Sequence, residues 1–304
     1  MTRSRRRDRF APQRRVTNWG RWGDDDEAGA LNLVTAAETR RAAGLVTHGR
    51  VVMLGQALGP DTVVPRHRKR VERFMVRDGG DYASGARHQG GFQFAEDVVS
   101  YASHSGTHID ALSHAWYGDA LYNGHPSTTV RSTTGAQRCG AERLRPIVTR
   151  GVLLDVAAVA GAPLDVGDVV TREHLVAAAD RAGVALEPGD AALIRTGWFG
   201  VAGDDPDRYL AGEPGLDLSA ARWLAAADVA VVGADNYAIE AMPFTGEDWF
   251  PVHRLLIRDL GVPLVEGMVL DELAGLAEGA FLFVASAVSV VGSTAGQVCP
   301  IAVL

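Results

Sequence analysis

The sequence predicts a single α/β domain, and three observations support that prediction. From Gly151 to the end of the chain, short apolar segments with strand-like patterns alternate with helical patterns. No internal repeat and no linker rich in proline, glycine or serine divides the 304 residues. Hydrophobic residues make up 47% of the chain, which is enough for one substantial core. We therefore expect one domain over residues 16–304.

The first fifteen residues differ from the rest of the chain in charge. They contain seven arginines and one aspartate, a charge of +6. The whole chain has a net charge of −7, so the remainder carries −13. Residues 4–10 weakly resemble a twin-arginine export signal, but no hydrophobic segment follows them. We expect residues 1–15 to be a basic, disordered tail, and the acidic remainder argues against binding to nucleic-acid phosphates.

Cysteine content and hydropathy predict a cytoplasmic protein. Cys139 and Cys299 lie far apart and form no Cys-x-x-Cys pair, a pattern typical of reduced thiols rather than of a disulfide framework. Every apolar run is interrupted by glycine or charge before it reaches membrane-spanning length. We therefore expect neither a membrane nor a nucleic acid as a partner.

The elements before residue 104 are predicted from capping and apolar patterns. Thr35 and Glu38 form a capping-box pattern, and the helix that they begin should end at Gly44. Strands are expected at residues 51–58 and 97–103, with a long polar, glycine-rich loop at 60–95. Four aromatic residues are candidates for a pocket wall: Trp19, Trp22, Phe92 and Trp116. The sequence alone does not decide among them.

The alternation after residue 150 supplies most of the predicted core. Turns rich in glycine separate its strands from helices with polar caps such as Ser219. The predicted strands cover residues 151–156, 191–196, 229–233 and 280–285, with a continuation at 288–291, and the predicted helices cover 171–181 and 220–227. The histidines expected to face solvent are His48, His125 and His174.

A cluster of metal-ligand side chains lies at His104-Ser-Gly-Thr-His108-Ile-Asp110-Ala-Leu-Ser-His114. Three of the nine histidines and an aspartate fall within these eleven residues. Imidazole and carboxylate are ligands that suit zinc, manganese or iron(II). On a straight strand His104 and Asp110 would start roughly 20 Å apart, so the chain must bend, and Gly106 permits the bend. The alternative, scattered polar residues at the mouth of a sheet, is less favourable, because such a cluster is costly without a metal or hydrogen bonds.

A second pair of candidate ligands lies downstream. Pro251 suits the first turn of a helix, which places His253 near the helix N-terminus. Glu266 follows thirteen residues later, after a helix end near Gly261 and a short extended run. Taken alone, the histidine could be structural and the glutamate a surface acid.

The spacing His104-x-Gly-Thr-His108-x-Asp110-x-x-x-His114 resembles the signature of the cyclase family of metal-dependent hydrolases, which includes bacterial kynurenine formamidase and isatin hydrolase. The resemblance covers most of the chain, and the flanking motifs are similar to those of the longer branch of the family. These motifs are Asn18–Gly23, Gly29–Asn32, Leu121–Gly124, Ile194–Trp198, Val252–Leu256 and Pro300–Leu304.

The resemblance implies a fold, a site and an assembly. The fold is the family's swivelling β/β/α arrangement, a barrel-like mixed sheet flanked by helices. The ligands of a first ion correspond to His104, His108 and Asp110. Asp110 and Glu266 would bridge to a second ion, which His253 completes. His114 corresponds to the general acid/base that protonates the departing amine. Also implied are one or two divalent ions per chain, zinc or manganese, and a homo-oligomer, either a dimer or a tetramer.

The implied activity is hydrolysis of a C–N bond in a small carbonyl substrate, an aryl formamide or a cyclic amide, as in tryptophan catabolism to kynurenine. A metal ion lowers the pKa of bound water toward about 7 and polarises the carbonyl group. The absence of a Gly-x-Ser-x-Gly motif disfavours a serine hydrolase of the α/β type.

The chain departs from the kynurenine formamidases at two places. They resemble Asp-Ala-Pro-x-His where Asp110-Ala-Leu-Ser-His114 stands here, and they have a tryptophan that residues 58–64 lack. Neither departure changes the metal ligands, but both change residues on which the resemblance to a formamidase depends, so the substrate is not decided. Three alternatives therefore stay open: a lactone hydrolase, a metal-dependent cyclase or dehydratase of secondary metabolism, and a non-catalytic metal-binding sensor.

Overall fold

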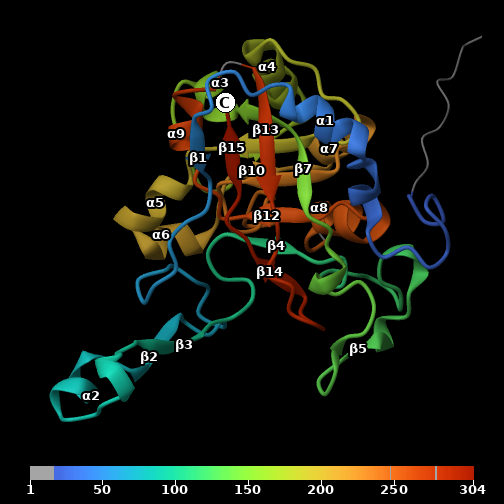
Figure 1. Ribbon diagram of the computed structural model, residues 1–304. Coiled ribbons are helices and arrows are strands. Elements are labelled where there is room, and N and C mark those ends of the chain that lie inside the picture. The colour runs from blue at the N-terminus through green and yellow to red at the C-terminus, as the bar shows by residue number, and fades with distance from the viewer. Residues whose placement is uncertain (1–16, 247, 278) are drawn as a thin grey trace, which may run out of the picture.

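A nine-stranded mixed sheet forms the centre of the molecule (Figure 1). The computed structural model of the chain describes residues 17–246, 248–277 and 279–304, so the predicted tail at residues 1–15 lies outside the described residues. In spatial order the strands are β1 (Val51–Met53), β15 (Ile301–Val303), β13 (Ala280–Ala285), β7 (Ile147–Asp155), β9 (Ala191–Arg195), β11 (Val231–Ala234), β12 (Leu264–Glu266), β4 (His108–Asp110) and β14 (Ala295–Gln297).

The strands at the middle of the sheet are parallel, and those toward its two edges are antiparallel. Strands β7, β9, β11 and β12 pair in parallel. Parallel strands are normally buried on both faces. This burial explains the continuously apolar sequence of β9. Ala192 and Ile194 contribute to the hydrophobic core on one face, whereas Ala191 and Leu193 contribute to the core on the other.

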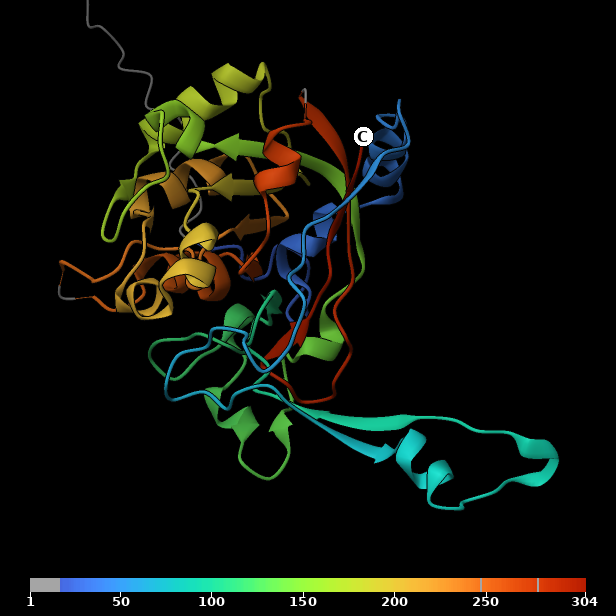
Figure 2. The same cartoon turned by 90° about the vertical axis from the view of Figure 1, so that its left-hand side faces the viewer.

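Helices cover both faces of the curled sheet, which confirms the predicted barrel-like sheet flanked by helices (Figure 2). Helices α4 and α7 pack against each other over one face, and α1 packs against β7 and β13 on the opposite face. The helices are α1 (Ala36–Ala43), α2 (Gly79–Ala83), α3 (Val156–Ala160), α4 (Arg172–Ala182), α5 (Phe199–Asp204), α6 (Pro206–Ala211), α7 (Leu218–Ala226), α8 (Pro251–His253, continued by a π-helical stretch at Arg254–Asp259) and α9 (Asp271–Ala274).

Several predicted elements are confirmed at their ends. Helix α1 begins after Thr35, whose hydroxyl accepts a hydrogen bond from the Ala37 amide, and it ends at Gly44. Helix α4 ends at Gly183, which has the left-handed conformation that favours glycine. Strand β13 has the predicted bounds.

Other predictions at element ends are wrong. The cap of α7 is Asp217, which accepts from the Ala220 amide at 2.8 Å, and not Ser219. The strand predicted at residues 51–58 ends at Met53, and residues 288–291 form no strand. His125, predicted to face solvent, is buried, and its Nε2 lies 3.2 Å from the Asp26 carbonyl oxygen.

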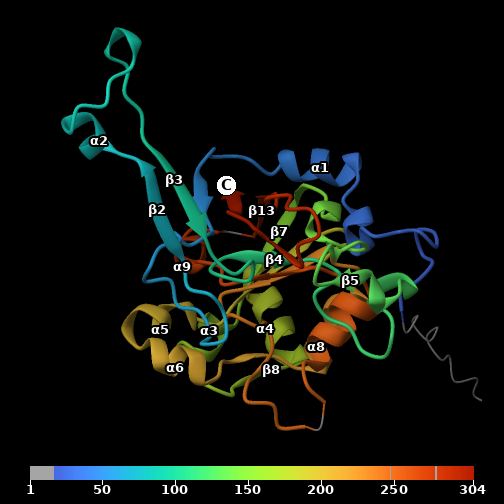
Figure 3. The ribbon, with the colours of Figure 1, turned by 90° about the horizontal axis from the view of Figure 1, so that it is seen from below.

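The largest error concerns residues 60–100. Strands β2 (Glu72–Arg77) and β3 (Glu96–Ser100) pair only with each other, and with α2 they form an arm that projects from the body (Figures 2 and 3). The predicted polar loop therefore contains a strand and a helix, and the strand predicted at residues 97–103 ends three residues early, outside the central sheet. On the arm, Phe74 and Val98 lie directly opposite each other and are 57% and 52% exposed. These apolar side chains therefore do not belong to a hydrophobic core.

Smaller strand pairs complete the described chain. Strand β5 (Val130–Arg131) pairs with β6 (Gly135–Ala136), and β8 (Val169–Val170) pairs with β10 (Gly215–Leu216). Among the helices of the described residues, none has both the length and the hydropathy needed to cross a membrane.

Candidate metal centre

Strand β4 places the central part of the motif beside a candidate ligand from far along the chain. It pairs antiparallel with β12, where His108 lies opposite Glu266, and with β14, where Asp110 lies opposite Ala295. The bend predicted before it is confirmed, because Gly106 has a φ of +60°. The bend brings His104 close to Asp110. On a straight strand the two side chains would lie too far apart to meet.

Asp110 is the common contact of the four imidazoles. Its Oδ1 lies 2.9 Å from His104 Nδ1 and 3.7 Å from His108 Nε2. Its Oδ2 lies 3.9 Å from His114 Nε2 and 3.8 Å from His253 Nε2. The three histidines predicted as ligands and the histidine predicted as the acid/base therefore converge on one carboxylate.

Glu266 joins the cluster from the other side. Its Oε2 lies 3.2 Å from His108 Nε2, and its Oε1 lies 3.3 Å from His253 Nε2. The predicted helix start is also confirmed, because Pro251 occupies the first turn of α8 and His253 follows within it. Glu266 is buried, so the alternative that it is a surface acid is wrong.

The cluster has the properties of a site for a divalent cation. Ligand atoms lie within 4.8 Å of one another in two overlapping groups, one of His104, His108 and Asp110 and one of Asp110, His114 and His253. Although they lie close to one another, several of these buried atoms form no hydrogen bond of suitable geometry within the described residues: His104 Nδ1, His108 Nε2, both Asp110 oxygens and Glu266 Oε1. Buried polar atoms without partners are costly, and a bound cation would satisfy them together.

Groups behind the cluster orient the imidazoles. His108 Nδ1 lies 2.9 Å from the Gly106 carbonyl oxygen, and His104 Nε2 lies 3.1 Å from Thr294 Oγ1. His253 Nδ1 lies 2.7 Å from Glu240 Oε1. In each case the other ring nitrogen is left to face the cluster, which is the usual arrangement behind a metal-binding histidine.

Glu240 is a functional residue that sequence reasoning missed. Besides His253 Nδ1, its carboxylate accepts the amides of Val252 and His253, each at 3.0 Å, at the start of α8. It precedes His253 by thirteen positions in an irregular segment, so no helix or strand periodicity connects the two residues.

The protonation of the imidazoles differs within the cluster. Burial disfavours the imidazolium of His253, but Glu240 and Glu266 outweigh burial and raise its pKa to about 10. Burial lowers the pKa of His114 to about 4, with help from His104 and His253 and against the attraction of Asp110. Without a metal, His253 is therefore protonated at neutral pH and His114 is neutral.

The two carboxylates are held ionised. Burial would raise the pKa of Asp110, but His114, His104 and His108 together hold it well below its usual range. Burial and Asp110 also oppose the charge of Glu266, yet contacts with His108 and His253 lower its pKa. Ionised carboxylates are the form that binds metal.

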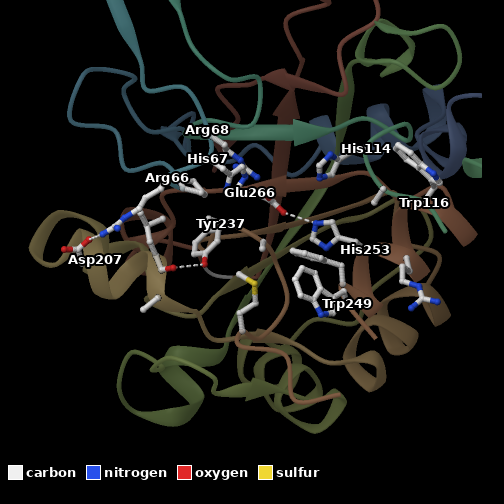
Figure 4. A pocket seen from close by; sticks show the side chains of 18 residues that line it. Arg66, His67, Arg68, His114, Trp116, Asp207, Tyr237, Trp249, His253 and Glu266 are labelled. Atoms are coloured by element: carbon white, nitrogen blue, oxygen red, sulfur yellow. Dashed lines mark hydrogen bonds and ion pairs between the residues drawn. The ribbon is translucent and has the colours of Figure 1, made fainter. Parts of the chain in front are cut away.

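A cavity of about 1060 Å³ opens beside the cluster, and His114, His253 and Glu266 line it (Figure 4). The His108 side chain is 2% exposed, whereas that of His114 is 29% exposed, so His114 can meet a molecule in the cavity. Of the candidate aromatic residues, Trp116 lines the cavity. Trp19 and Trp22 pack against the core, and Phe92 lies on the arm.

Comparisons with known proteins give a family match and similar folds. The chain matches the Cyclase family over residues 45–241, and a comparison with curated protein sequences gave no match. The crystal structure of a novel cyclase has 33% sequence identity and a TM-score of 0.90, with 95% of this chain and 100% of that chain covered.

More distant similarities concern the fold alone. Isatin hydrolase A from Ralstonia solanacearum has 21% identity and a TM-score of 0.63, with 88% of this chain and 95% of that chain covered. A predicted metal-dependent hydrolase from Bacillus stearothermophilus has 20% identity and a TM-score of 0.53, with coverage of 83% and 97%.

Proposed function

This chain belongs to the Cyclase family, as its histidine motif predicted, and from that premise we propose that it is a metal-dependent hydrolase of a C–N bond in a small carbonyl compound. The observation that carries the proposal is the group of buried ligand atoms without hydrogen-bond partners, beside a cavity large enough for a substrate. Imidazole and carboxylate ligands suit zinc or manganese.

The residues that would hold one or two such ions are His104, His108, Asp110, His253 and Glu266. When bound, a divalent metal supplies acidified water and polarises a substrate carbonyl. Metal binding would satisfy the atoms of these residues that face the cluster, several of which form no hydrogen bond within the described part of the chain. The opposite ring nitrogens of His108 and His253 already have partners in Gly106 and Glu240.

His114 would move the proton. Because its pKa is lowered to about 4, its Nε2 is an unprotonated acceptor at neutral pH. It would take a proton from the attacking water and return it to the amine nitrogen as the C–N bond breaks. The exposure of its side chain to the cavity supports this role over a purely structural one.

The finer proposal is an aryl formamide or cyclic amide as substrate, in the manner of an arylformamidase of tryptophan catabolism. Its support is the motif together with the fold shared with isatin hydrolases, whose named substrate is a cyclic amide. The experiment is to incubate zinc-loaded and manganese-loaded protein with aryl formamides, isatins and lactones and to follow the products by mass spectrometry.

The masses of the products decide between the proposal and its alternatives. Addition of one water to an amide supports the proposal, and addition of water to lactones alone would replace the finer part of it. Loss of water or an unchanged mass in a rearranged product would instead show a dehydratase or cyclase. Protein that neither binds nor responds to zinc, manganese or iron would overturn the proposal.

We also propose that the protein is a homo-oligomer, a dimer or a tetramer, in the cytoplasm. The arm supports the oligomer, because an isolated two-stranded ribbon is marginally stable in water and its apolar side chains lie exposed. Light scattering on the purified protein would test the assembly, and Phe74→Asp should shift the mass toward that of one chain.

A further inference from the structure

The cavity beside the metal centre has walls of opposite chemical character. Trp249 lies on one side of the cavity, and Arg66, His67 and Arg68 lie on another, with Glu266 and His253 between them (Figure 4). Phe250, whose ring contacts that of His253, also lines the cavity. The cavity volume of about 1060 Å³ is slightly above the usual range for sites that enclose a drug-sized ligand. A molecule with a single aromatic ring would fill only part of it.

The aromatic wall continues up to the metal centre. The ring of Phe250 lies 5.1 Å from that of His253 in an edge-to-face arrangement, and the ring of Phe244 lies 4.8 Å from that of Phe250. The ring of Trp249 lies 6.3 Å from that of Phe244, and Trp249 is 74% exposed. A row of rings with an exposed indole at its end is suited to stacking against a flat aromatic ligand.

The basic wall contains one arginine without an acidic partner. Arg66 lies 3.6 Å from Asp207, and Arg254 pairs with Asp248 and stacks on Tyr117. Arg68 is half-buried, and within the described residues it forms no ion pair. A hydrogen bond from its Nη1 to the His104 carbonyl oxygen holds Arg68 beside the motif without neutralising its charge.

Tyr237 lies within electrostatic reach of Arg68. Burial and then Glu213 raise the pKa of Tyr237, and the positive charge of Arg68 acts against that rise. The phenol has one long hydrogen bond, 3.5 Å to the Leu210 carbonyl oxygen, so its hydroxyl can turn to another acceptor. Arg68 and Tyr237 both line the cavity.

We infer that the substrate is an anionic aromatic amide with more than one ring, whose rings stack on Trp249 and Phe250 and whose anionic group pairs with Arg68. This inference rests on the proposed function for the position of the amide, which lies toward His114. Arg68 would be a specificity-determining residue rather than a catalytic one, because it would contact the anionic group of the substrate and not the amide.

Binding of stable probes tests the inference without relying on turnover. The probes are naphthalene-2-sulfonate, its neutral analogue 2-(methylsulfonyl)naphthalene, and benzenesulfonate, titrated by calorimetry into zinc-loaded protein. A sulfonate is a weak metal ligand, so its affinity reports the walls of the cavity. The naphthalene sulfonate should bind about tenfold more tightly than either of the other two, since it alone has both the charge and the second ring.

Variants assign the two contributions. Arg68→Met should remove the preference for the sulfonate over the neutral sulfone, and Arg68→Lys should restore most of it. Arg66→Met is the matched control, because Arg66 is 91% exposed and already faces Asp207, and it should leave the preference unchanged. Trp249→Ala should weaken both naphthalene probes equally. Metal content and melting temperature are measured for each variant, so that a disturbed motif is recognised.

The outcomes separate the inference from the proposed function. Selective binding that Arg68→Met leaves intact, or equal binding of the one-ring and two-ring sulfonates, would overturn the inference even if formamides are hydrolysed. Selective, Arg68-dependent binding with no hydrolysis of any amide would support the inference on the cavity and overturn the proposed function.

Discussion

The two halves of the candidate metal centre are held in different ways. His104, His108 and Asp110 are placed by backbone geometry, namely the bend at Gly106 and the pairing of β4, and the groups behind the imidazoles are neutral. His253 is instead held by a buried carboxylate, Glu240. Changes to backbone conformation should therefore disturb the first half, whereas changes to charge should disturb the second.

The largest expected effect is the loss of a central ligand. His108→Ala should lose both bound metal and activity, because the partners of a missing ligand are left uncompensated. Elemental analysis of the purified variant measures the metal. His125→Ala removes another buried histidine, outside the cluster, and should keep its metal. Equal metal content in the two variants would contradict the assignment of His108.

The second effect is a loss of turnover without a loss of metal. His114→Ala should bind metal and melt like the unmodified protein, while kcat falls by about 10²–10⁴-fold. An imidazole accepts a proton only above its pKa, so the acidic limb of kcat/KM should lie near pH 4 or lower with a cation bound, not near the reference value of about 6.5. The variant should lose that limb.

The alternative outcome for His114 is specific. His114 also belongs to the second group of possible ligands, with Asp110 and His253. If the variant loses metal in proportion to activity, His114 is a ligand, and another residue must carry the proton.

A smaller effect should distinguish the half held by charge. Because the pKa of His253 is raised to about 10, metal binding at pH 7 must displace its proton, and metal affinity should rise with pH. Glu240→Gln should reduce the protons released, as measured by calorimetry in buffers of different ionisation enthalpy, and should weaken metal binding by about 10–100-fold.

A matched control exists for that charge. Glu213→Gln alters another buried glutamate, which accepts the amides of Tyr237 and Ala238. It lies within electrostatic reach of His253 and Glu266, but among the described residues it forms no hydrogen bond or ion pair with a candidate ligand. The variant should leave the proton count unchanged. A number of released protons that falls equally in both variants would show a general effect of altering a buried glutamate and not a specific effect of Glu240.

The smallest effect should come from the bend in the other half. Gly106→Ala places an alanine in a left-handed conformation, which costs about 1–2 kcal/mol and should lower the Tm by about 2–6 °C. Its Cβ would also approach Leu58 Cδ2 to 2.3 Å, so the double variant with Leu58→Ala separates the contact from the backbone strain. Gly59→Ala has open space and no positive φ, and should melt unchanged.

The same contrast explains what the sequence could predict. The motif from His104 to His114 was recognisable because its ligands and its glycine lie within eleven residues. His253 and Glu266 were placed through the family resemblance, since neither has a local pattern of its own. Glu240 was missed because its contact with His253 depends on the packing of an irregular segment.

The fold divides in the same manner. Strand β9 and helix α4 were predictable because burial and caps leave periodic patterns in the sequence. The arm was not predictable, because apolar side chains are exposed on it. A prediction that relates hydrophobicity to burial therefore fails there. One domain over residues 16–304 stays a prediction, as does the character of residues 1–15.

The position of β14 has a consequence for how the protein acquires its site. Gln297 donates its side-chain amide to the carbonyl oxygens of Ser103 and Ser105, at 3.0 and 2.8 Å, across a separation of 192 positions in the second case. Contacts between residues so far apart close late, because the entropy of a long loop must first be overcome. A chain still emerging from the ribosome therefore lacks the support of β14 for the histidine motif, so metal capture is expected to follow folding rather than to guide it.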